Sequence, residues 1–165
     1  MEVNTHDHPL VFVTRQESFS AAHRLHSSKL TDEENLEIYG KCNNEHFHGH
    51  NYTVKVTIRG PVHPETGMVV NLSSLKEAIR ELVVEPFDHK NLDLEVSEFS
   101  KLGIPSTMEN LAVIIWKRLF SRFKQLLYEV VVQETNGHFA TYRGETLYFN
   151  IVVIKRYSVI FLPSS

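Results

Sequence analysis

The stretch HGHNYTVKVTIR, residues 48–59, shows the most regular alternation of apolar and polar side chains in this chain. Its apolar members, which all share one parity, are Tyr52, Val54, Val56 and Ile58. Strict alternation is typical of a strand that buries one face. The stretch therefore predicts a β-strand. His48 and His50 are two residues apart, so their imidazoles should leave the same face of that strand.

Three further segments have the same period of two. Val11 to Leu25 alternates less regularly, Tyr128 to Glu134 alternates clearly, and Asn136-Gly137 marks a tight turn into His138 to Arg143. The intervening segment Leu30 to Gly40 is rich in carboxylates and is interpreted as a polar loop. The pattern predicts four strands, in two pairs.

Two helices are predicted between these pairs of strands. The first has an apolar stripe at helical spacing and should end at Pro86; the stripe consists of Leu75, Ala78, Ile79, Leu82 and Val83. The second should open at Ser106, in a capping box with Glu109, and its apolar face consists of Leu111, Ile114, Ile115, Leu119 and Phe123. The order of elements predicts an α+β fold, in which both helices cover one face of an antiparallel sheet.

Composition limits the classes of function. The chain has 165 residues, a net charge of −3 and one cysteine, which fits a single domain in a reducing, cytoplasmic setting without an internal disulfide. The acidic balance argues against nucleic-acid binding. The apolar run from Thr146 to Pro163 is interrupted by Lys155 and Arg156. It therefore predicts an added strand or a poorly packed tail rather than a membrane anchor.

Histidines are the first candidates for chemistry. His23, His48 and His50 would supply three neutral imidazoles to a zinc ion and leave a fourth position open. His46 shares the parity of the pair and is an alternative third ligand. Cys42 is an alternative fourth ligand, which would close the site and make it structural. A chain with 10 histidines also places two close together by accident.

An uncoordinated Cys42 would instead be a base or nucleophile, because a nearby metal or histidine lowers the pKa of a thiol. His89, with Asp88 as its orienting neighbour, is the histidine available for this task. Glu134 ends an apolar strand face, where it is either solvated or accepts hydrogen bonds from a ligand. Thr107 and Glu109 are explained by helix capping alone.

Several motifs in one order carry a resemblance to a known family. They are FSAAHRL (19–25), GKCNN (40–44), HGHNY (48–52), GMVVNL (67–72), DHKNLD (88–93), TMENL (107–111) and QET (133–135). Together they resemble the eukaryotic 6-pyruvoyltetrahydropterin synthase family. The resemblance divides the chain into a polar segment 1–10, a pterin synthase domain 11–145 and an extension 146–165.

The resemblance implies the tunnelling fold, with a four-stranded antiparallel sheet per subunit, assembled as a homohexamer with its sites between subunits. It implies that zinc is bound by His23, His48 and His50, and that Cys42 accepts the proton. It further implies catalytic roles for Asp88, His89 and Glu134, and a pterin pocket that includes Glu134, Thr107 and Glu109. The implied lyase converts 7,8-dihydroneopterin triphosphate to 6-pyruvoyltetrahydropterin and triphosphate, in tetrahydrobiopterin biosynthesis.

The chain departs from the family at Phe47, where a glycine is usual, and in the extension beyond Glu145. Two other functions stay open. One is that of 6-carboxytetrahydropterin synthase, which shares the fold and a similar zinc site. The other is that of a non-catalytic zinc-stabilised binding module, in which Cys42 is a ligand.

Overall fold

Two long antiparallel strands, β1 (Leu10–His23) and β2 (His48–Pro61), are central to the computed structural model, which describes residues 8–146, 149–154 and 158–163. Their register pairs Leu10 with Pro61 at one end and His23 with His48 at the other. The alternation predicted for residues 48–59 is confirmed, because the even-numbered apolar residues are fully buried. The register therefore brings histidines from two strands to the same end of the sheet.

The sheet has the strand order β3-β1-β2-β4-β5. Strands β4 (Leu127–Thr135) and β5 (His138–Tyr142) are antiparallel, as predicted. The four-stranded antiparallel sheet expected from the resemblance is extended by a fifth strand, because the short β3 (Lys90–Asn91) pairs with β1 in parallel. A two-residue strand leaves no periodicity in the sequence. A single chain forms this open, mixed sheet without closing a barrel.

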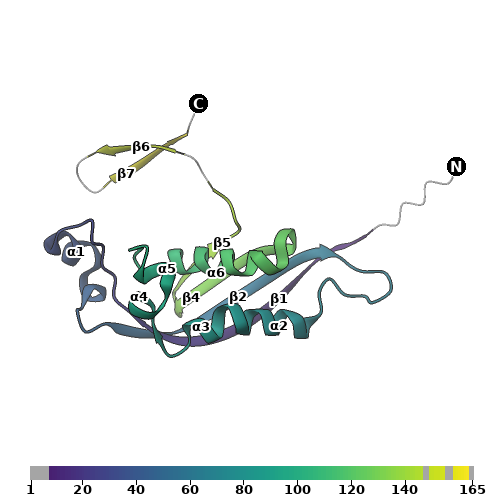
Figure 1. Cartoon of the computed structure of the whole chain (residues 1–165). Coiled ribbons are helices and arrows are strands. Elements are labelled where there is room, and N and C mark those ends of the chain that lie inside the picture. The colour runs from purple at the N-terminus through teal and green to yellow at the C-terminus, as the bar shows by residue number, and fades with distance from the viewer. Residues whose placement is uncertain (1–7, 147–148, 155–157, 164–165) are drawn as a thin grey trace.

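The two predicted helices lie along one face of the sheet (Figure 1). Helix α2 (Leu72–Ile79) continues through a π-helical turn, η2 (Arg80–Val84), into α3 (Glu85–Phe87). The helix ends at Phe87, so the predicted end at Pro86 is confirmed to within one residue. In the π-helical turn the Glu85 amide donates to the Arg80 carbonyl five residues back, and the chain stays helical past the proline.

Helix α6 (Met108–Phe123) begins one residue later than predicted. Its N-cap is Thr107, whose hydroxyl accepts a hydrogen bond from the Asn110 amide at 3.3 Å. The expected capping box of Ser106 with Glu109 is wrong, because the Ser106 hydroxyl lies instead near His23 and the Arg24 carbonyl. The apolar stripes are confirmed, with residues such as Leu75 and Leu119 fully buried against the inner face of the sheet.

The segment interpreted as a polar loop contains helix α1 (Asp32–Tyr39), so that interpretation is wrong. Thr31 and Glu34 form a capping box, and the buried Asn35 binds the backbone of the preceding loop. Because this helix buries no apolar stripe, hydrophobic periodicity does not reveal it. The remaining short helical elements are η1 (Gly40–Asn43), α4 (Leu92–Glu95), α5 (Ser97–Ser100) and η3 (Lys124–Leu126).

The C-terminal apolar run was expected to form an added strand or a poorly packed tail. Strands β6 (Phe149–Ile154) and β7 (Ser158–Pro163) pair with each other in a separate two-stranded sheet and do not extend the main sheet. Tyr148, Lys155 and Arg156 lie outside the described residues. Among the residues that are described, no helix has the length and apolar character needed to cross a bilayer.

Candidate metal centre

The register of β1 and β2 assembles three histidines. His23 and His48 are direct partners, and His50 is the next residue along the same face of β2. The ring centroids are 4.5 Å apart for His23 and His48 and 5.1 Å apart for His48 and His50. One nitrogen from each of the three rings lies within 4.8 Å of the others. The predicted cluster is thus present, with a spacing that allows all three to reach one ion.

His23 is oriented by the segment that precedes α6. Its side chain is 1% exposed, and its Nδ1 lies 2.8 Å from the Ser106 carbonyl oxygen. A carbonyl only accepts hydrogen bonds, so Nδ1 is the donor and, in the neutral ring, Nε2 keeps its lone pair. Metal-binding histidines are commonly oriented in this way by a backbone carbonyl. The fold therefore sets His23 in the tautomer that a metal ligand needs.

His48 and His50 have ring nitrogens that the fold leaves without hydrogen bonds. Both nitrogens of His48 and Nε2 of His50 are buried and have no hydrogen-bond partner among the described residues. Burial lowers the pKa of both histidines, and the nearby His23 lowers it further, although the charge of Glu134 opposes this. Buried nitrogens without partners are costly unless a ligand satisfies them. The neutral donor set fits a metal ion such as zinc.

The two alternative ligands lie outside this cluster. The His46 side chain is 86% exposed and lies 3.6 Å from Glu45 at the surface, so the alternative that used it as third ligand is wrong. Within the described residues, the ligand group contains the three histidines and does not include Cys42. Three protein ligands with an open position are the arrangement of a catalytic zinc site, and four closed ligands that of a structural one.

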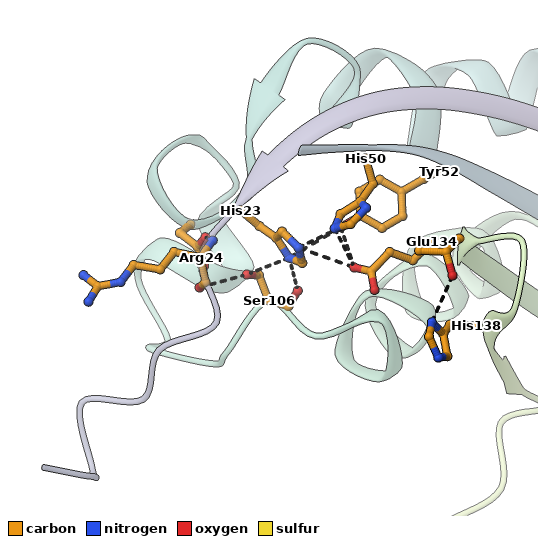
Figure 2. A network of polar contacts seen from close by, with 9 residues as sticks. His23, Arg24, His50, Tyr52, Ser106, Glu134 and His138 are labelled. Atoms are coloured by element: carbon orange, nitrogen blue, oxygen red, sulfur yellow. Dashed lines mark hydrogen bonds and ion pairs between the residues drawn. The ribbon is translucent and has the colours of Figure 1, made fainter. Parts of the chain in front are cut away.

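Glu134 and Tyr52 lie beside the histidine cluster (Figure 2). The Tyr52 hydroxyl donates a hydrogen bond to Glu134 Oε1 at 3.2 Å. The same oxygen lies 3.4 Å from His23 Nε2 and 3.5 Å from His50 Nε2. Burial raises the pKa of Tyr52, and Glu134 raises it further, so the phenol stays protonated and remains a donor. Glu134 is therefore held at the cluster by a fixed hydrogen bond.

Cys42 lies in η1, which is held in place by the two residues that follow β1. The Leu25 amide donates to the Cys42 carbonyl at 2.8 Å, and Arg24 Nε donates to the backbone and side-chain oxygens of Asn43 at 3.0 and 3.2 Å. The thiol itself is free and partly exposed. Because Leu25 is two residues after His23, its hydrogen bond to Cys42 brings the Cys42 backbone near the histidine cluster.

Asp88 and His89 point toward one another at the surface. Asp88 Oδ2 accepts a hydrogen bond from His89 Nδ1 at 2.8 Å, and Asp88 Oδ1 accepts one from the Ser20 amide at 2.8 Å. The Ser20 bond, followed by the His89 bond, lowers the pKa of Asp88. His89 has a positive φ of 58° and an 85% exposed side chain. It lines an open depression of about 480 Å³ that also includes Lys90 and Asn51.

Thr107 and Glu109 both lie at the start of α6, but their surroundings differ. Thr107 follows Ser106, whose carbonyl binds His23, and so lies beside the histidine cluster. Glu109 lines another depression, of about 240 Å³, between α6 and β5. Within one chain, no described hydrogen bond or ion pair joins Glu109 or the Asp88–His89 pair to the three histidines, but His89 and His50 line the same depression.

A family model described as 6-pyruvoyl tetrahydropterin synthase matches residues 12–145. The chain belongs to the 6-pyruvoyl tetrahydropterin synthase family. It is 54% identical over 138 residues to a 6-pyruvoyl tetrahydrobiopterin synthase of Drosophila melanogaster, covering 82% of this chain and 81% of that protein. It is 50% identical over 134 residues to the human protein of the same name, covering 81% and 91%.

A solved structure of 6-pyruvoyl tetrahydropterin synthase from Caenorhabditis elegans is similar in both sequence and fold. The TM-score is 0.79 and the identity 46%, with 84% of this chain and 98% of that chain covered. The family resemblance predicted from the motifs is confirmed, as is the α+β fold with helices on one face of the sheet.

Sequence reasoning missed two groups in this 6-pyruvoyl tetrahydropterin synthase family member. Tyr52 shares the parity of His48 and His50, and that signal was available to place its hydroxyl near the histidines. The Ser106 carbonyl gave no such signal, because a backbone group 83 residues from His23 reaches it only through the tertiary fold.

Proposed function

We propose that this chain is a zinc-dependent 6-pyruvoyltetrahydropterin synthase, a lyase of tetrahydrobiopterin biosynthesis. It would convert 7,8-dihydroneopterin triphosphate to 6-pyruvoyltetrahydropterin and release triphosphate. The observation that carries this proposal is the cluster of His23, His48 and His50, in which both ring nitrogens of His48 and Nε2 of His50 are buried without a hydrogen-bond partner among the described residues. The names of relatives about half identical to this chain support it as well.

The residues around the cluster would share the chemistry. Zinc held by the three imidazoles would supply Lewis-acid polarisation of the substrate's side-chain hydroxyls. Cys42, outside the ligand set, would take the proton from the adjacent carbon and return it to the pterin ring, a general acid-base step. Glu134, fixed by Tyr52, would accept hydrogen bonds from the amino and ring N–H groups of the pterin.

The remaining predicted site residues would act between subunits. The Asp88–His89 pair lies on the surface of its own chain, so we propose that it activates Cys42 of a neighbouring copy. Thr107 would line the pterin pocket near the metal, and Glu109 would do so across an interface. This arrangement requires the homohexamer implied by the family. We further propose that the enzyme is cytoplasmic and that its domain spans residues 11–145, flanked by segments 1–10 and 146–165.

Two alternatives are less well supported. A 6-carboxytetrahydropterin synthase would use a similar zinc site, but the relatives with about half their residues in common are named for the pyruvoyl product. A non-catalytic zinc module would need Cys42 in the ligand set, and the ligand group of the described residues does not include it.

Replacement of Cys42 by Ala tests the proposal. We expect Cys42→Ala to keep the fold and the zinc content while losing most turnover of 7,8-dihydroneopterin triphosphate, with the product identified by mass. His48→Ala should lose zinc, and the exposed neighbour His46→Ala should keep both zinc and turnover. Loss of zinc and of folding in Cys42→Ala would support the structural module, and a carboxylated product would support the other synthase.

A further inference from the structure

A separate pocket of about 250 Å³ lies beside the histidine cluster. The side chains that matter for its chemistry are Arg24, His26, Ser28, Phe47, Asp93 and Ser100. Arg24 directly follows His23, and Phe47 directly precedes His48. The Ser106 hydroxyl lies 3.5 Å from both the Arg24 carbonyl oxygen and His23 Nδ1. The pocket is therefore close to the proposed metal ligands without containing any of them.

Arg24 is the main cationic group of this pocket, and its orientation is fixed. Its Nε donates to both oxygens of Asn43, and the described contacts of the guanidinium use this nitrogen alone. Figure 2 shows the side chain extending away from His23 and Ser106. The two terminal nitrogens are thus available to a ligand. A guanidinium held in this way is suited to bidentate binding of a phosphate group.

Neighbouring groups add to the same chemistry. The ring of His26 is held by its Nδ1, 3.1 Å from Asn43 Oδ1, and the exposed Ser28 and Ser100 supply hydroxyl donors. Asp93 opposes anion binding, although its Oδ2 accepts a 2.6 Å hydrogen bond from the Arg24 amide. The volume lies below the roughly 300–1,000 Å³ of pockets for drug-sized ligands, as expected for a compact polar group.

We propose that this pocket binds phosphate groups of the triphosphate carried by the substrate. The proposal rests on the proposed function, which supplies a substrate with a triphosphate next to the metal-bound portion. Phe47 forms one wall of the pocket, and Arg24 links the pocket to the Cys42 loop through Asn43. Binding of the triphosphate here would place the reacting carbon between the phosphate pocket and the histidine cluster.

The test is the affinity of the full-length protein for inorganic triphosphate, titrated by calorimetry at constant ionic strength before and after zinc loading. The comparison separates binding through the metal from binding through the pocket. Ser100→Asp adds a negative charge and should weaken binding about threefold to tenfold. Asp93→Asn removes one and keeps an acceptor for the Arg24 amide, so it should tighten binding by a similar factor.

Ser74→Asp adds the same negative charge at an exposed position on α2. This variant is the matched control and should bind triphosphate as the wild type does. Equal affinities in the wild type, Ser100→Asp and Asp93→Asn would overturn the proposal, as would an equal loss in Ser74→Asp. A wild type with the expected binding pattern that releases no triphosphate from 7,8-dihydroneopterin triphosphate would support this pocket and contradict the proposed function.

Discussion

Replacement of Tyr52 by Phe removes one oxygen atom from the interior of the site. Tyr52 is 0% exposed, and its ring stacks on Phe19 with centroids 5.3 Å apart, a contact that Phe retains. The chief loss is the hydrogen bond from the hydroxyl to Glu134 Oε1 at 3.2 Å, and the longer contacts of the hydroxyl with the two ring nitrogens of His23, both at 3.4 Å, are lost with it. The substitution therefore measures how strongly the hydroxyl holds Glu134 and His23 in the site.

The expected loss follows from the charge of the acceptor. A hydrogen bond to a charged group contributes about 1.5–3 kcal/mol, and a long bond belongs at the lower end of that range. We expect Tyr52→Phe to lower the free energy of unfolding by about 1.5–2 kcal/mol, which corresponds to a fall of about 3–8 °C in melting temperature for a chain of this size. The measurement is denaturant unfolding of metal-free protein, so that ligand binding does not contribute.

Tyr128→Phe is the matched control. The Tyr128 ring packs edge-on against Phe12 with centroids 4.8 Å apart, and its hydroxyl makes no hydrogen bond to the residues described. This variant should unfold within about 0.5 kcal/mol of the wild type. An unchanged stability of Tyr52→Phe, or an equal loss in Tyr128→Phe, would refute the role assigned to the Tyr52 hydroxyl.

Two further predictions concern the backbone before His48 and the response to acid. Phe47 has a φ of 62°, which glycine adopts freely, so Phe47→Gly should be more stable to denaturant than Phe47→Ala by about 1 kcal/mol; equal stabilities would contradict this. Because burial holds the pKa of His48 and His50 below the usual 6.5, the unfolded chain binds more protons as the pH falls. The unfolding free energy of metal-free protein should therefore decrease between about pH 7.5 and 5.5, and an increase over that range would exclude the explanation.

The parts of the fold that follow from local periodicity were predictable. Alternation in residues 48–59 predicts β2 and places His48 and His50 on one face, and the spacing of Leu111 and Leu119 predicts the buried face of α6. These features depend only on which side chains a single element must bury. The histidine cluster was predictable to the same extent, because only the partner strand that supplies His23 had to be inferred.

The remaining features depend on contacts between distant segments or on single backbone angles. Strand β3 forms because the two residues that follow His89 pair with β1 in parallel. Helix α1 is stabilised by its caps and by the buried Asn35 rather than by an apolar stripe. The positive φ of His89 accompanies a hydrogen bond from its amide to the Ser20 carbonyl at 2.7 Å. Neither the contact nor the angle leaves a periodic signal in the sequence.

The central claim is that three imidazoles hold the zinc ion and Cys42 does not. X-ray absorption spectroscopy of the zinc-loaded protein tests it directly, because zinc–sulfur and zinc–nitrogen distances differ, at about 2.3 and about 2.0–2.1 Å. We expect about one zinc per chain, with a shell of nitrogen and oxygen ligands. A sulfur ligand at the longer distance, or a shell unchanged in His48→Ala, would contradict the account.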